Sequence, residues 1–172
     1  NAGAPDARRI ALRYLAMGPS HMRQLREHIS LNVDHAGEFQ EMHRNEARTY
    51  SPPSGLDIAV LERQLNEPDR ETVAFAAYLL ALHQRMDTLH LLVRFWRESG
   101  QRDDLYQPLL YRAIAAANDA SQVPVLEEMY GRFNKGDYRL RDFYWSIRPM
   151  TGERVLALRK RIRDEVGIQN LQ

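Results

Sequence analysis

Two stretches of this chain, residues 71–99 and 106–134, show the same arrangement of apolar residues at an offset of thirty-five positions. The paired positions are Phe75, Leu79, Leu82, Leu89, Val93 and Phe95 in the first stretch and Leu110, Ile114, Ala117, Pro124, Glu128 and Tyr130 in the second. A polar corner interrupts each stretch, at residues 83–87 and 118–122. A period in the thirties, with helical spacing on either side of a turn, predicts stacked helical hairpins.

The remaining segments also have helical spacing, and none alternates like a strand. Helices are predicted at residues 56–66, 70–82, 87–99, 105–117, 122–132, 138–147 and 152–166. Ser54, Asp69 and Thr151 are expected to cap three of them, because short polar side chains accept hydrogen bonds from the free amides of a first helical turn. The predicted fold class is therefore all-α, with antiparallel helical hairpins arranged as an α-solenoid or as a helical bundle.

The hairpins at residues 70–134 resemble tetratricopeptide-type repeats. Ala76, Ala77 and Ala81 stand where such repeats need small residues for close helix approach. The Trp, Gly and Pro landmarks of the family are not in their usual order, and the resemblance covers fewer than three repeats. It implies a TPR-like arrangement that binds a peptide or a helix on its concave face.

Residues 1–17 are interpreted as an amphipathic helical segment, and one interpretation is that they are a fused partner peptide. Ala7, Ile10, Ala11, Tyr14 and Met17 follow one face, with Arg8, Arg9 and Arg13 opposite. We expect Ile10, Tyr14 and Met17 to anchor this helix in an apolar groove. Residues 18–22, Gly-Pro-Ser-His-Met, match the scar that protease cleavage and a cloning site leave behind, and the alternative is coincidence.

The next segments are a long helix at 23–48, a linker at 49–55 with two prolines and a glycine, and a helical-hairpin domain at 56–172. Alternating steps of three and four, as in a coiled coil, connect Met22, Leu25, Ile29, Asn32, Ala36, Phe39 and His43. The polar residues Asn32 and His43 make this seam imperfect. Two interpretations stay open. The long helix packs along its own domain, or it forms the seam of a self-assembling homo-oligomer.

The sequence offers little support for catalysis. It has no cysteine and no glycine-rich phosphate loop, and its histidines lack the spacing that a shared metal ion needs. Basic and acidic residues nearly balance, 24 against 23, and no apolar run is long enough to cross a bilayer. We expect a protein that is not an enzyme, with no cofactor or metal and a cytoplasmic location. A mature exported protein is the alternative to that location.

Charges of opposite sign gather in two regions. The C-terminal basic face comprises Arg139, Arg141, Arg148, Arg159, Lys160, Arg161 and Arg163, with Phe133, Tyr138, Phe143, Tyr144 and Trp145 interleaved. Its interpretations are packing with a solvated basic rim, binding of an acidic protein, and binding of nucleic acid by base stacking. An acidic bias in residues 34–71 includes Glu67, Asp69 and Glu71, and it allows an internal electrostatic match or self-association.

The leading hypothesis is a non-enzymatic adaptor, scaffold or chaperone-like module that binds an amphipathic helix of a protein partner in an apolar groove. The predicted partner-binding residues are Phe75, Tyr78, Leu89, Phe95 and Trp96. The alternatives are a nucleic-acid-binding helical protein that uses residues 132–163, and a self-assembling structural subunit.

Overall fold

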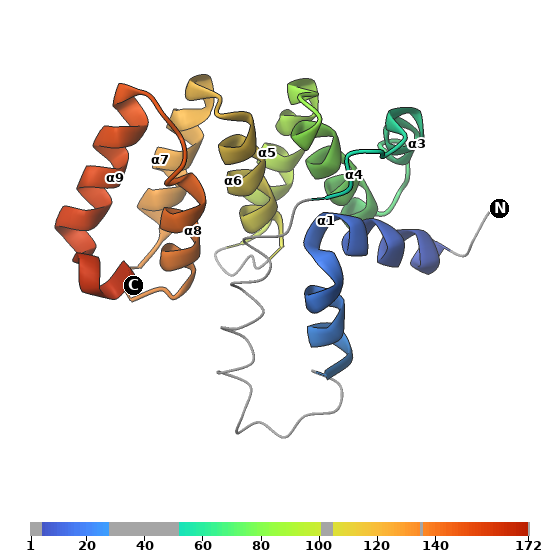
Figure 1. Ribbon diagram of the computed structural model, residues 1–172, viewed down its shortest axis with the longest axis horizontal. Coiled ribbons are helices and arrows are strands. Elements are labelled where there is room, and N and C mark those ends of the chain that lie inside the picture. The colour runs from blue at the N-terminus through green and yellow to red at the C-terminus, as the bar shows by residue number, and fades with distance from the viewer. Residues whose placement is uncertain (1–4, 28–51, 101–104, 135, 172) are drawn as a thin grey trace. The chain divides into compact units, whose positions relative to one another are not determined.

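The computed structural model describes residues 5–27, 52–100, 105–134 and 136–171, with the side chains of residues 7–17 in the first range (Figure 1). Within these ranges the regular structure is helical and contains no strand, so the all-α prediction is confirmed. The α-helices are α1 (Pro5–Glu27), α3 (Ile58–Gln64), α4 (Arg70–Leu82), α5 (Leu89–Glu98), α6 (Tyr106–Ala117), α7 (Val123–Arg132), α8 (Arg139–Ile147) and α9 (Glu153–Val166). Short 3-10 helices are η2 (Met86–Thr88), η3 (Ala120–Gln122) and η4 (Ile168–Leu171).

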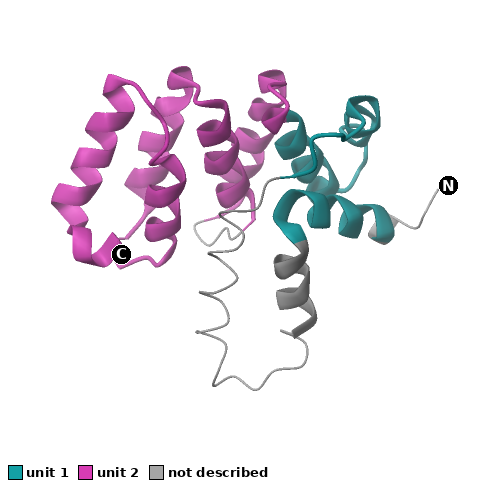
Figure 2. Ribbon diagram, viewed as in Figure 1, with its two compact units in different colours: residues 1–80 teal, residues 81–172 magenta. Residues whose placement is uncertain are grey.

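The chain divides into two compact units, residues 1–80 and residues 81–172 (Figure 2). The first unit contains α1, α3 and most of α4. The second contains the end of α4 and all the elements that follow it. Each unit is described below by itself.

In the first unit, α1 changes direction at Gly18, as Figure 1 shows. Gly18 has φ 82° and ψ 172°, a backbone conformation that side chains with a Cβ rarely adopt. The predicted helix at residues 5–17 therefore ends at this break. Of the predicted long helix at 23–48, residues 23–27 are helical, and residues 28–48 lie outside the described residues together with residues 49–51 of the linker.

Two aspartates fix the starts of α3 and α4. Asp57 caps α3 by accepting hydrogen bonds from the backbone amides of Ala59 (3.0 Å) and Val60 (3.3 Å). The prediction of Ser54 as this cap is wrong, because α3 begins at Ile58, two residues later than expected, and Asp57 is the residue that precedes it. Asp69 caps α4 as predicted, by accepting from the amide of Thr72 at 3.0 Å and from its hydroxyl at 2.6 Å.

In the second unit, α5 packs on α6, α6 on α8, and both α7 and α8 on α9. The core between them holds Leu92, Phe95, Leu110, Tyr111, Ile114, Leu126, Phe143, Ile147, Leu158 and Ile162, all buried. The rings of Tyr111 and Phe143 meet edge to face at 5.5 Å between α6 and α8. Burying each such side chain contributes about 1.5–3 kcal/mol to the free energy of unfolding.

The sequence repeat has a counterpart at the two polar corners. In each copy a helix is followed by a 3-10 turn and a second helix: α4, η2 and α5, then α6, η3 and α7. Gln84 (φ 65°) and Asn118 (φ 50°), thirty-four residues apart, both have left-handed backbone conformations at these corners. The two corners thus share a left-handed residue followed by a 3-10 turn.

The start of α9 differs from the prediction. Its cap residue is Gly152, and Thr151 does not cap it. Thr151 instead pairs with Asn118: its amide donates to the Asn118 Oδ1 at 2.9 Å, and its hydroxyl accepts from the Asn118 Nδ2 at 3.0 Å. This pair connects the end of α6 to the turn before α9.

Candidate helix-docking site

Three carboxylates gather between the end of α3 and the first turn of α4. Glu67 and Asp69 lie in the loop that joins the two helices, and Glu71 lies in the first turn of α4. Their side chains are 27%, 36% and 35% exposed, respectively. The positive end of the α4 dipole favours negative charge here. We call Glu67, Asp69 and Glu71 the acidic ledge.

Arginines of α1 face the acidic ledge. The Nη1 of Arg8 donates to the Oε1 of Glu67 at 2.5 Å. The Arg9 guanidinium lies between two carboxylates, with its Nη1 4.0 Å from an Asp69 oxygen and its Nε 4.0 Å from a Glu71 oxygen. These contacts join segments about sixty residues apart in the sequence, and they hold α1 beside the start of α4.

Arg13, the third arginine on this side of α1, lies over an aromatic ring. Its guanidinium carbon is 6.0 Å from the centroid of Phe75, which is fully buried in α4. Burial lowers the pKa of Arg13, while the nearby Glu71 carboxylate opposes that shift. A cation in this position is attracted by the negative face of the ring.

Apolar residues of α1 are buried beside these arginines. Leu12, Ala16 and Met17 are each 6% exposed or less. By contrast, Ile10 is 51% exposed and Tyr14 is 46% exposed. Of the three predicted anchors only Met17 is buried, and Leu12 and Ala16 are the residues of this segment that are buried with it.

Asp69 contributes to the ledge as an ionised group. Although burial alone would raise the pKa of Asp69, the hydrogen bonds from Thr72 and the charge of Arg9 outweigh it and lower that pKa below its ordinary value. The carboxylate that caps α4 thus also attracts α1. Partly buried charges of both signs meet here, so that each offsets part of the other's desolvation cost.

The predicted partner-binding residues do not form an open surface. Phe75, Tyr78, Leu89, Phe95 and Trp96 are all less than 9% exposed. These side chains are core residues of the helices that carry them. Phe75 contacts α1 through Arg13.

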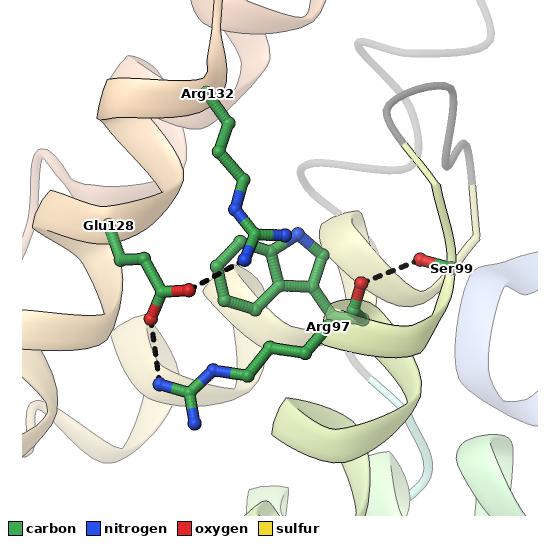
Figure 3. Close-up of polar contacts among 5 residues, drawn as sticks. Arg97, Ser99, Glu128 and Arg132 are labelled. Atoms are coloured by element: carbon green, nitrogen blue, oxygen red, sulfur yellow. Dashed lines mark hydrogen bonds and ion pairs between the residues drawn. The ribbon is translucent and has the colours of Figure 1, made fainter.

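Trp96 is covered by a polar network between α5 and α7 (Figure 3). The Arg132 guanidinium lies 4.2 Å from the Trp96 ring centroid and donates to Glu128 at 2.7 Å. Glu128 also accepts from Arg97 at 2.7 Å, and these interactions lower the pKa of Glu128, the bond from Arg97 contributing most. A partner helix would have to displace this network to reach the indole.

Several residues of the predicted basic face already contact other side chains of the chain. Arg139 forms an ion pair with Asp137 at 2.6 Å, and Arg148 lies over the Trp145 ring at 4.7 Å. Arg161 lies over Tyr130 at 4.7 Å and 3.6 Å from Glu165. The remaining members of the face are Arg141 in α8 and Arg159, Lys160 and Arg163 in α9.

The aromatic residues among these cations are mostly unavailable for base stacking. Phe143 and Tyr144 are buried, and Phe133 packs against Phe143 at 5.3 Å between ring centroids. The Trp145 indole donates to the Leu171 carbonyl at 2.5 Å. Tyr138, at 55%, is the most exposed of the five. The packing interpretation therefore accounts for most of this region.

The second unit also has an open groove of about 550 Å³ beside α5 and α7, lined by Met86, Leu89, Val93, Arg97, Gln122 and Val125 among others. Nowhere in the described ranges do three His, Cys, Asp or Glu residues cluster as a metal site would require. The helices described here are also too short or too polar to span a membrane.

Sequence reasoning missed most of the docking site, although two signals were present. The arginines at positions 8, 9 and 13 were visible as one face of an amphipathic helix, and the ledge belongs to the acidic region at 34–71. Nothing in the sequence connected the two. Comparison of the chain with protein-family models, with curated proteins and with solved structures finds no match.

Proposed function

We propose that this chain is a non-enzymatic protein-interaction module that binds an amphipathic helix of a partner protein at the place that the first segment of α1 occupies. The observation that carries the proposal is the mixed chemistry of that contact. Leu12, Ala16 and Met17 are buried, while Arg8 pairs with Glu67 beside them. Helix recognition in proteins commonly combines such apolar anchors with charges at the rim.

Two further features support the proposal. The break at Gly18 makes residues 5–17 a separate helix, so that this segment has its own docking contacts. The repeated order of elements at α4–α5 and α6–α7 favours a TPR-like arrangement, in which helical hairpins serve as a binding scaffold. If residues 18–22 are a cloning scar, residues 1–17 are themselves the partner's helix.

The experiment that tests the proposal separates the helix from the rest of the chain after folding. A protease recognition sequence replaces residues 18–22, the folded chain is cleaved there, and gel filtration shows whether residues 1–17 remain bound. We expect them to co-elute with the larger fragment and to exchange with an excess of a labelled peptide of the same sequence. Immediate loss of residues 1–17 after cleavage would contradict the proposal.

Matched variants identify the docking face. Leu12→Asp places a charge at a buried position and should release the cleaved segment, because it removes about 1.5–3 kcal/mol of apolar burial and adds an unpaired charge. Tyr14→Asp makes the same kind of change at a position that is 46% exposed and should leave the segment bound. Release by Tyr14→Asp alone would show that the opposite face docks.

A further inference from the structure

We infer that the helix recognised at this surface belongs to a defined class, which carries two adjacent arginines and a third arginine four residues after the second. The acidic ledge and Phe75 recognise the guanidinium groups of these arginines rather than positive charge in general. In this chain the pattern is Arg8-Arg9-x-x-Leu12-Arg13-x-x-Ala16-Met17. The inference rests on the proposed function and names the chemistry of its partner.

The position of Arg9 is the first argument for guanidinium recognition. Its Nη1 lies 4.0 Å from an Asp69 oxygen and its Nε lies 4.0 Å from a Glu71 oxygen, so that two nitrogens of one planar group lie near two carboxylates. A lysine ammonium is a single point of charge at the end of a flexible stem and lacks the second nitrogen. Substitution by lysine at this position preserves the charge but loses the bridge.

The position of Arg13 is the second argument. Its guanidinium lies over the buried Phe75 ring, and burial lowers its pKa. A guanidinium is more weakly hydrated than an ammonium and stacks on aromatic faces, so it loses less on leaving water at such a place. Arg13 should therefore discriminate most strongly against lysine.

The burial pattern of α1 completes the motif. Leu12 and Ala16 are buried one turn apart, next to the arginines, so the inner face requires an apolar residue and a small residue at these positions. Ile10, Ala11 and Tyr14 are exposed, so the corresponding positions of a partner helix are not restricted in sequence. The class is thus defined by six positions, with the outward ones free to vary.

The test uses the full chain and measures amide hydrogen exchange of residues 8–17, which reports how often the docked helix opens. An undocked helix of this length is marginal in water and exchanges quickly. We expect Arg9→Lys and Arg13→Lys each to lower the protection about tenfold or more, although the net charge is unchanged. Ile10→Lys, at an exposed position, is the control and should leave protection unchanged.

A double-mutant cycle ties the effect to the ledge. In a Glu71→Gln background, Arg9→Lys should lower protection much less than it does in the parent, because one carboxylate of the bridge is gone. Equal protection in the parent and in both lysine variants would overturn the inference and leave the proposed function standing. Rapid exchange of residues 8–17 in the parent itself would instead show that the helix does not dock, and it would remove the proposed function as well.

Discussion

Asp69 illustrates how much one side chain does at this site. One of its oxygens accepts hydrogen bonds from both the amide and the hydroxyl of Thr72, and the other oxygen lies 4.0 Å from the Arg9 guanidinium. The cap that starts α4 and the attraction for α1 therefore depend on the same negative charge. Any condition that neutralises it should weaken both at once.

Acidification provides the test of this dependence. Because the pKa of Asp69 is lowered in the folded protein, the stability it contributes is complete above its ordinary pKa of 3.8 and is lost as the pH falls through the lower, folded value. We expect the melting temperature to fall more steeply below about pH 4 in the parent than in Asp69→Asn. Asp164→Asn, at an exposed position of α9, is the matched control and should keep the steep dependence of the parent.

A tyrosine gives the opposite dependence in the second unit. The Tyr130 hydroxyl donates to Glu165 at 2.7 Å, and burial, followed by this hydrogen bond, raises the pKa of Tyr130 to about 12. Its contribution to stability is therefore complete below pH 10, the ordinary value, and is lost as the pH rises towards 12.

Tyr130→Phe should remove this alkaline sensitivity. Chemical denaturation between pH 9 and about 12 should show a declining free energy of unfolding for the parent and a flatter profile for the variant. Tyr138→Phe is the control, because Tyr138 is 55% exposed, and it should behave as the parent does. A profile for Tyr130→Phe as steep as that of the parent would assign the alkaline loss to other groups.

At the scale of elements, the chain follows its local chemistry closely. The predicted helix at 70–82 matches α4, and α6, α8 and α9 each begin one residue later than predicted. Caps, prolines and apolar spacing act within a few residues, so the sequence reveals them directly. The 3-10 turns η2 and η3 escaped prediction, because their residues have ordinary helical character and only the left-handed Gln84 and Asn118 set them apart.

The docking face of α1 shows where such reasoning fails. The apolar spacing of Ala7, Ile10 and Tyr14 revealed a stripe, but spacing alone cannot say which stripe meets the rest of the protein. Ion pairs with residues about sixty positions away select the other face. Long-range pairing of this kind has no local signature.

Glycines at two positions should respond in opposite ways to alanine. Gly18→Ala forces a Cβ into a φ of 82° and should lower the free energy of unfolding by about 1 kcal/mol or more. Gly131→Ala, inside α7 with nothing within 4 Å of the added Cβ, should instead raise it by about 0.5–1 kcal/mol. Chemical denaturation of both variants measures the two shifts, and a neutral Gly18→Ala would mean that the break in α1 needs no glycine.

At the scale of the whole molecule, the ion pairs between α1 and the acidic ledge join parts of the chain about sixty residues apart, from Arg8 to Glu67 and from Arg9 to Asp69 and Glu71. The direct energy of these contacts is modest, since partly exposed ion pairs contribute about 0–1 kcal/mol each. The role of these ion pairs is to select which face of the partner helix docks and in which register, as charge patterns do in other interfaces.

Reversing both charges should expose this selectivity. Arg8→Glu alone and Glu67→Arg alone should each place like charges together and loosen residues 5–17, whereas the double variant should restore their resistance to limited proteolysis. The intact mass of the fragments identifies the cut sites. A double variant as sensitive as either single variant would show that this ion pair has no selective role.

The position of the ledge in the chain has one further consequence. All three of its carboxylates fall within residues 67–71, so the part of the surface that reads charge is encoded by five consecutive residues. A stretch this short can be exchanged between domains, or rewritten, as long as position 69 keeps a residue that caps α4. Substituting it together with the arginines of the guest helix would create pairs of helix and ledge that do not bind each other's partners. A single scaffold would then provide many binding sites of separate specificity.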